Sequence, residues 1–344
     1  MLKYFNGSFI ITVLGVLAAY FWGEHVHSGT GFICVFVALI LGILEVSLSF
    51  DNAVVNAVKL EKMEKVWQHR FLTWGIAIAV FGMRFLFPLL VVAIFARLNL
   101  FKVLQVALSD SNLYAQYLQK THAPIVTFGG AFLLMLFFSY FFNTEKSVNW
   151  LRFIEEKFSK LGNIKGLETV LTLIAVMITQ HFVSAEIKAS LLVSGIFGVV
   201  IFLAIDGITH WLEKHEEERA RALSTVVKGG GLVSFLYLEL IDASFSLDGV
   251  LGAFALSQDI VIITIGLSIG AMFVRSLTIM LVETKTLAKY IYLEHGAHWA
   301  IGALALIMFI STSVEVPEIV TGLIGLGFIL AALASSIYAN KREK

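Results

Sequence analysis

A run of apolar residues near the N-terminus contains a group of polar side chains that could bind a cation. The stretch Leu44–Asn52 carries Glu45, Ser49, Asp51 and Asn52 between Leu, Val and Phe residues. A carboxylate at mid-membrane depth costs several kcal/mol unless it is paired, hydrated or coordinated. The stretch is therefore a candidate functional site.

The same pattern returns 197 residues later, in Ile241–Gly249. Position by position, Asp242 stands for Glu45, Ser246 for Ser49 and Asp248 for Asp51, whereas Gly249 replaces Asn52. A repeated acidic pattern within apolar segments is typical of a transporter built from two related halves.

The side chains of the two stretches supply only hard oxygen donors. Such donors suit Mg²⁺, Ca²⁺ or Mn²⁺, and the absence of thiolate and imidazole argues against Cu⁺ and Zn²⁺. Four carboxylates exceed the charge of one divalent ion, so arginines or protons must compensate the rest. The candidate cation ligands are Glu45, Ser49, Asp51, Asn52, Asp242, Ser246 and Asp248, and the candidate charge-compensating residues are Arg84 and Arg275.

Two geometries fit the first stretch. On a regular helix Glu45 and Ser49 share a face, while Asp51 lies about 120° from Glu45. Either the segment faces a polar interior over a wide arc, or the helix is distorted near 47–51 so that both carboxylates converge. Discontinuous helices of the second kind occur at transporter midplanes. The sequence leaves both open.

The repeat continues beyond the acidic stretches. Gly75 precedes Arg84 by nine residues, and Gly266 precedes Arg275 by nine. A further match sets Gly130 and Ser139 beside Gly302 and Ser311. The repeat unit is therefore three hydrophobic segments long. For the two arginines a purely structural ion pair remains the simpler interpretation. Glu239, nearly on the face of Asp242, is interpreted as an interfacial or capped residue.

Composition places the chain in the membrane. Of its 344 residues 58% are hydrophobic and 15% charged, in many apolar runs near 20 residues long, which predicts a polytopic all-α membrane protein. The single cysteine, Cys34, excludes an internal disulfide. The first apolar run lacks a signal-peptidase pattern, so we expect a retained span.

Ten spans fit the sequence. Nineteen of the 25 Lys and Arg then fall on the side of the N-terminus and four on the other side, which predicts that both termini are cytoplasmic. The predicted spans are about 8–22, 32–57, 72–96, 124–142, 167–184, 189–206, 230–255, 258–282, 298–313 and 318–338.

Five crossings separate the two acidic spans, so they run in opposite directions and their halves form an inverted repeat. We divide the chain into a first span (1–30), repeat A (31–142), a linking region (143–228), repeat B (229–313) and a last span with a cytoplasmic tail (314–344). Within the linking region, 143–165 is expected to be an amphipathic interfacial helix and 211–223 a charged helix continuing into the cytosol.

The stretch Glu45-x-x-Leu48-Ser49-x-Asp51-Asn52 resembles the signature of the TerC-like integral membrane proteins, named for tellurium resistance, within the wider lysine-exporter-like transporter superfamily. The second stretch resembles that family's second acidic motif. The resemblance implies a metal-ion exporter of the bacterial inner membrane, with manganese favoured and calcium as the alternative. It implies ion-binding or relay roles for Glu45, Asp51, Asn52, Asp242 and Asp248. The extra spans, the long cytoplasmic segments and Asp248-Gly249 depart from the usual family pattern, which identifies a divergent branch.

The leading hypothesis is a secondary transporter that exports a divalent cation in exchange for protons, with the lipid bilayer as its environment. A cationic amino acid or small organic cation is an alternative substrate, and a membrane scaffold without transport is a third hypothesis. We expect no enzymatic activity and no cofactor, because the sequence lacks a convincing Ser–His pair, a His-Glu-x-x-His motif and a dithiol. Nothing in the sequence indicates nucleic-acid binding.

Overall fold

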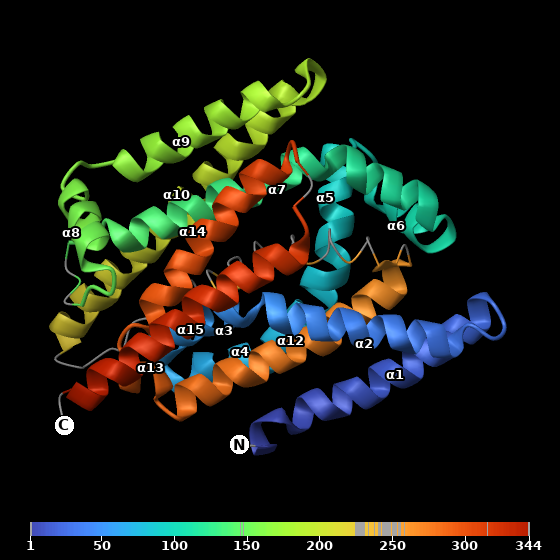
Figure 1. Cartoon of the computed structure of the whole chain (residues 1–344), viewed down its shortest axis with the longest axis horizontal. Helices are drawn as coiled ribbons and strands as arrows, with labels where there is room; N and C mark the ends of the chain where they lie inside the picture. The colour runs from blue at the N-terminus through green and yellow to red at the C-terminus, as the bar shows by residue number, and fades with distance from the viewer. Residues whose placement is uncertain are drawn as a thin grey trace.

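The computed structural model consists of helices joined by short loops (Figure 1). It describes residues 2–144, 146, 148–223, 231–232, 234–236, 238–239, 242, 249, 253, 256–257, 259–314 and 316–342, and no β-strand occurs among these. The elements are η1 (Leu2–Phe5), α1 (Asn6–Val26), α2 (Gly31–Leu48), α3 (Phe50–Lys62), α4 (Lys65–Ala77), η2 (Ile78–Leu86), α5 (Phe87–Phe95), α6 (Leu100–Ser109), α7 (Ser111–Phe141), α8 (Arg152–Leu161), α9 (Leu167–Thr179), η3 (Gln180–Phe182), α10 (Ala185–Leu223), α12 (Ile260–Glu283), α13 (Thr286–Lys289), α14 (Leu293–Ser311) and α15 (Glu318–Arg342). The predicted all-α fold is confirmed.

Seven helices among the described residues are long and apolar enough to cross a bilayer, and a pair bent by 41°, Lys65–Gly75 with Val80–Ile94, can form an eighth span. The seven are Lys3–Val26, Gly31–Leu48, Asn112–Phe141, Ala185–Ile208, Ile260–Glu283, Leu293–Ser311 and Val320–Arg342. The chain is therefore an integral membrane protein. Of the other two predicted spans, 167–184 corresponds to a shorter apolar helix, and 230–255 lies largely outside the described residues. The count of ten stays a prediction.

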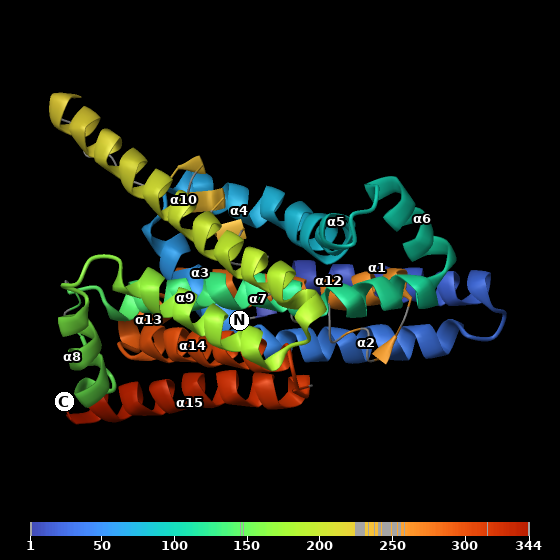
Figure 2. The ribbon, with the colours of Figure 1, turned by 90° about the horizontal axis from the view of Figure 1, so that it is seen from above.

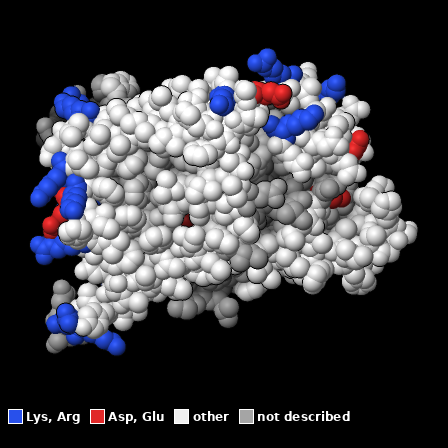
Figure 3. All heavy atoms as spheres, turned by 45° about the horizontal axis from the view of Figure 1, so that its top comes forward, with Lys and Arg blue, Asp and Glu red and all other residues white. Residues whose placement is uncertain are grey.

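Most of the long helices run along the long axis of the molecule, with α8, α13 and the C-terminus gathered at one end (Figure 1). The space-filling view shows a broad surface almost free of Lys, Arg, Asp and Glu, with the charged groups near its margins (Figure 3). Large apolar side chains are also exposed among the described residues; Phe32 and Phe36 of α2 are 76% and 65% exposed. An uncharged apolar surface matches the hydrocarbon layer of a bilayer.

The core is formed mainly where α7 and α14 pack together, the third helices of the two predicted repeats. The glycines that match between the repeats lie at this contact. A Cβ on Gly130 would lie 3.3 Å from the carbonyl oxygen of Ala305 on α14, and a Cβ on Gly302 would overlap the Phe137 ring on α7. Each helix thus presents its glycine to the other, an arrangement that a two-fold axis between the repeats would produce.

Several helix boundaries differ from the prediction. Helix α7 begins at Ser111 rather than near 124, because Asp110 caps it by accepting the Leu113 N–H at 3.0 Å, and Pro124 lies inside the helix. Helix α6 occupies a segment to which no helix was assigned; the Asn99 side chain caps it by accepting the Phe101 N–H. The predicted sixth span and the charged helix after it are one continuous helix, α10. Within the predicted interfacial segment 143–165, α8 covers Arg152–Leu161.

Candidate functional site

The first acidic stretch lies at a short interruption between two helices. Helix α2 ends at Leu48, α3 begins at Phe50, and Ser49 between them has φ −101° and ψ 20°. The hydrogen-bond ladder continues across the interruption, because the Ser49 N–H donates to the Glu45 carbonyl at 2.9 Å and the Ala53 N–H to the Ser49 carbonyl at 3.2 Å. The span is thus distorted at the position where the sequence allowed a distortion, without being unwound.

One guanidinium joins the two acidic stretches. Arg84 Nη2 lies 2.5 Å from Glu45 Oε1, and Arg84 Nη1 lies 3.1 Å from Asp242 Oδ2. All three residues are buried, with Arg84 only 1% exposed. One carboxylate from each acidic stretch is therefore paired with the same guanidinium; the charge-compensating role of Arg84 in transport stays a prediction.

Polar side chains of the first stretch complete this network. The Asn52 amide donates to Asp242 Oδ1 at 2.8 Å, and the Ser49 hydroxyl donates to Glu45 Oε1 at 3.2 Å. Both side chains are buried. Four of the predicted ligand residues, Glu45, Ser49, Asn52 and Asp242, thus lie in one hydrogen-bonded cluster with Arg84.

The position of Arg84 follows from an irregular helix. Arg84 belongs to the π-helical segment η2, and Pro88 follows four residues later. Proline has no N–H to donate to the carbonyl four residues before it, so the regular bond to the Arg84 carbonyl cannot form. The Thr264 hydroxyl of α12 lies 3.4 Å from this carbonyl oxygen. The bend of 41° lies earlier, between Gly75 and Val80, where the π-helical segment begins, and such segments often mark functional sites.

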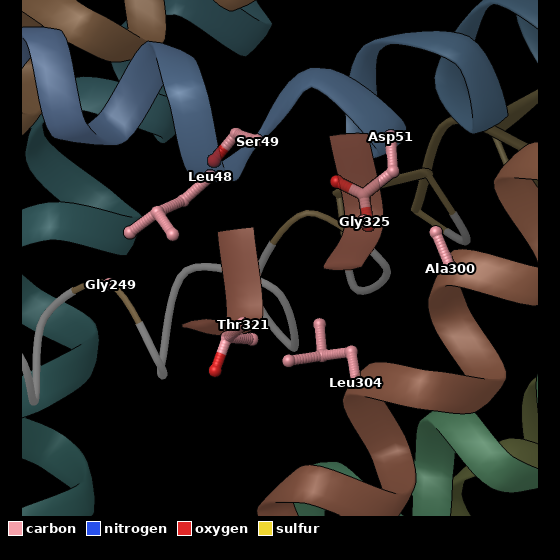
Figure 4. A pocket seen from close by; sticks show the side chains of 8 residues that line it. All are labelled: Leu48, Ser49, Asp51, Gly249, Ala300, Leu304, Thr321 and Gly325. Atoms are coloured by element: carbon pink, nitrogen blue, oxygen red, sulfur yellow. The ribbon is translucent and has the colours of Figure 1, made fainter. Parts of the chain in front are cut away.

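Asp51 lies apart from the Arg84 cluster and faces a small cavity (Figure 4). Its Oδ1 accepts the Asn52 N–H at 2.9 Å, and the residue is 5% exposed. The cavity of about 20 Å³ has room for about one water molecule. Its lining comes from the first stretch, the second stretch, α14 and α15, namely Leu48, Ser49, Asp51, Gly249, Ala300, Leu304, Thr321 and Gly325.

The two carboxylates of the first stretch therefore point to different places, so the geometry in which both converge is not observed. No hydrogen bond or ion pair within the described part of the chain joins Asp51 to Glu45 or Asp242. No group of three or more His, Cys, Asp or Glu side chains in that part is arranged to hold a metal ion. Asp248 and Ser246 lie outside the described residues. The predicted shared cation site stays a prediction.

Arg275, the counterpart of Arg84, has a partner that the sequence interpretation did not assign. Its Nη2 lies 3.3 Å from Glu239 Oε1, and its guanidinium carbon lies 4.1 Å from the centre of the Phe71 ring. Glu239 is 4% exposed, so it is a buried ion-pair partner and not an interfacial residue. Its spacing of three residues from Asp242 was the signal that could have identified it.

Comparison with known proteins supports the membrane character of the chain. Over 153 residues, which are 42% of this chain and 57% of the relative, it is 32% identical to the uncharacterized membrane protein YceF of Bacillus subtilis (strain 168). The match thus spans less than two thirds of that relative. No solved structure matches the chain. Residues 50–343 match the model of DUF475, a family of proteins of unknown function. This match covers most of the chain, which therefore belongs to the DUF475 family.

Proposed function

We propose that the protein is a secondary transporter that exports a divalent cation, Mn²⁺ or Ca²⁺, through the paired acidic stretches in exchange for protons. The observation that carries the proposal is the buried bridge from Glu45 to Arg84 to Asp242. This bridge joins corresponding positions of the two matching stretches, where inverted-repeat transporters hold their substrates.

The charge balance supports transport over a purely structural role. The bridge, the Arg275 pair and the separate cavity beside Asp51 together hold four described buried carboxylates and two guanidiniums, namely Glu45, Asp51, Glu239, Asp242, Arg84 and Arg275. When all are ionised they carry a net charge of −2, and an uncompensated charge in an apolar interior is strongly unfavourable. One divalent cation, or two protons, would neutralise the group. A structural ion-pair network has no need for this excess of acid.

The size of the cavities favours a bare ion over an organic cation. The space beside Asp51 is about 20 Å³, and a second cavity beside Arg84, Asp242 and Arg275 is about 10 Å³. Each cavity has a volume that admits about one water molecule, whereas pockets for drug-sized ligands enclose hundreds of Å³. The oxygen donors and the resemblance to TerC-like exporters favour Mn²⁺ or Ca²⁺ within the divalent class.

Arg84 would act as an internal substitute for the transported ion. In the described conformation its guanidinium donates hydrogen bonds to oxygen atoms of Glu45 and Asp242. The transported metal ion would use these same oxygen atoms as ligands. Entry of a divalent ion would displace the guanidinium from at least one carboxylate, and release of the ion would restore the bridge. The positive charge of Arg84 thereby allows the empty transporter to remain folded.

We also propose an orientation of the protein in the membrane. The excess of Lys and Arg on the side of the termini favours both ends in the cytoplasm of a bacterial cell, with the protein in the cytoplasmic membrane.

The test is cation flux by the purified protein in proteoliposomes under an imposed pH gradient, with Mn²⁺, Ca²⁺ and Mg²⁺ compared. We expect saturable flux in the wild type, at least tenfold reduced in Asp51→Asn and in Asp248→Asn. Glu186→Gln, an exposed acid on α10, is the matched control and should transport normally.

Absence of binding and flux for all three ions, with the variants as stable as the wild type, would contradict the proposal. Cationic amino acids would then be assayed in the same vesicles. If no solute is transported and the acidic variants keep their cellular phenotype, the scaffold hypothesis would replace transport.

A further inference from the structure

A second polar cluster lies beside the Arg84 bridge. Glu239 and Arg275 form a buried pair joined by a single contact of 3.3 Å between Oε1 and Nη2. Glu239 Oε2 and Arg275 Nη1 have no hydrogen-bond partner among the described residues. Buried polar atoms in folded proteins are almost always paired, so these two atoms call for a partner that the described side chains do not supply.

The fold makes specific room for this pair. A Cβ on Gly75 of α4 would lie 2.6 Å from Glu239 Oε1 and would overlap Arg275 Nη2. The Phe71 ring, one helical turn earlier on α4, stacks on the guanidinium of Arg275. A glycine and an aromatic face of the same helix therefore hold the pair in place.

A small cavity lies between Arg275 of this pair and the Arg84 bridge. Its lining includes Arg84, Asp242, Arg275 and Asn56 of α3, whereas Glu239 is not among the lining residues. The Asn56 Oδ1 and Arg275 Nη1 atoms, both buried, have no partner in the described part of the chain. A cavity with such a lining suits a water molecule, which would link Asp242 to the Arg275 pair by hydrogen bonds.

The strength of pairing differs among the three clustered carboxylates. Glu45 accepts bonds from Arg84 and Ser49, and Asp242 accepts bonds from Arg84 and Asn52. Among the described residues, Glu239 accepts a single long bond, from Arg275. The charged groups that face it are Arg275 from α12, Arg84 from η2 and Asp242 from its own segment. Three carboxylates share two guanidiniums, so one proton neutralises the cluster, and Glu239 has the weakest compensation of its negative charge.

We infer that Glu239, held by Arg275 and Gly75, is the proton-binding site that couples proton movement to cation export. The inference rests on the proposed function. It places the binding of the exchanged proton on a residue outside the two acidic stretches. In the step, a proton from the aqueous phase forms one O–H bond on Glu239 while Arg275 stays charged. Cation binding at the Arg84 bridge adds two positive charges and releases this proton.

The test separates proton coupling from cation binding in the full-length protein, with Mn²⁺ as the probe. In detergent and weak buffer, Mn²⁺ binding should release about one proton fewer from Glu239→Gln than from the wild type. In proteoliposomes Glu239→Gln should keep Mn²⁺/Mn²⁺ counterflow within twofold of the wild type. It should lose accumulation driven by a pH gradient at least tenfold. Glu239→Asp should restore part of this accumulation, and Glu186→Gln should behave as wild type.

The possible outcomes distinguish failure of the proton site at Glu239 from failure of the proposed transport function. Accumulation driven by the pH gradient at wild-type level in Glu239→Gln overturns the proton site but leaves the transporter intact. Absence of Mn²⁺ binding and counterflow in the wild type overturns Mn²⁺ transport and the inference with it. Should Glu239→Gln fold poorly, Gly75→Ala tests the same pair from α4, because the methyl group displaces it. An unchanged pH profile of flux in Gly75→Ala would then overturn the inference.

Discussion

Arg84 is the residue on which the charge balance of the interior depends. Arg84 is 1% exposed. Its guanidinium forms ion pairs with both Glu45 and Asp242. Removing one partner from a buried ionic network leaves the remaining charges uncompensated, which costs about 3–5 kcal/mol. The stability of the protein should therefore respond to Arg84 far more than to any exposed basic residue.

Arg84→Met is expected to lower the free energy of unfolding by about 3–5 kcal/mol. The measurement is reversible denaturation in mixed micelles, with Lys102→Met, an exposed residue of α6, as the control. In the double variant Glu45→Gln with Arg84→Met the loss should be smaller than the sum of the two single losses, because the orphaned carboxylate is gone. Additive losses would show that the two side chains do not interact.

The sequence predicted part of this residue pattern. An arginine within an apolar span needs a partner, so Arg84 could be assigned to the acidic stretches before any geometry was known. The sequence did not predict that Asp51 and Glu45 lie in different surroundings. Their separation depends on the interruption at Ser49 and on the cavity beside α14 and α15. The repeat suggested the same partners for Arg275 as for Arg84, but Glu239, one turn before Asp242, pairs with it instead.

At the scale of elements, α8 is fastened to α14 by one acidic side chain. Glu155 is fully buried; it accepts the Trp299 indole N–H at 3.0 Å and lies 2.8 Å from His295 Nδ1. It also accepts the N–H groups of Trp150 and Leu151 at the start of α8. Burial alone would raise the pKa of Glu155, but the hydrogen bonds from His295 and Trp299 outweigh it and lower the pKa to about 2.

Acidification should weaken the attachment of α8 to α14 within a defined pH range. Because the pKa in the folded protein lies below the ordinary value of 4.5, the ionised carboxylate stabilises the fold above about pH 4.5. This contribution is lost as the pH falls from 4.5 toward 2. Glu155→Gln should cost about 2 kcal/mol at pH 7, and its difference from the wild type should shrink below pH 4.5.

The measurement is the thermal midpoint in detergent at pH 7, 5, 4 and 3. Glu156→Gln, which removes only the exposed pair with Arg152, should change stability by less than about 1 kcal/mol. A Glu155→Gln difference that stays constant from pH 7 to pH 3 would contradict the assigned role of the carboxylate.

The long apolar helices could be predicted from hydropathy, since a bilayer leaves few other structures possible for such segments. The short helix α6 could not, because its neighbours Asn99 and Asp110 act as caps, and caps near a chain reversal resemble loop residues in sequence. The π-helical segment at Arg84 also escaped prediction. Its placement beside Thr264 depends on how α12 packs there, which the sequence does not show.

At the scale of the whole molecule, the topology can be tested with one label. Cys34 is the single cysteine, so Cys34→Ser gives a background without thiols. In that background Lys102→Cys should react with a membrane-impermeant maleimide on intact cells. Glu156→Cys should react only after permeabilisation, because its segment is expected on the cytoplasmic side. The reverse pattern would invert the proposed orientation.

Helix α10 has a length that a membrane cannot accommodate. Its 39 residues span about 58 Å, close to twice the hydrocarbon thickness, whereas its apolar part, Ala185–Ile208, spans about 36 Å. About 22 Å of the helix therefore projects beyond the bilayer, in agreement with its protrusion from the body in Figure 2. A rigid rod of this length acts as a lever, and a tilt of about 10° within the membrane moves its tip by about 4 Å. Small tilts relative to α7 and α9, against which α10 packs, would thus become measurable displacements in the aqueous phase.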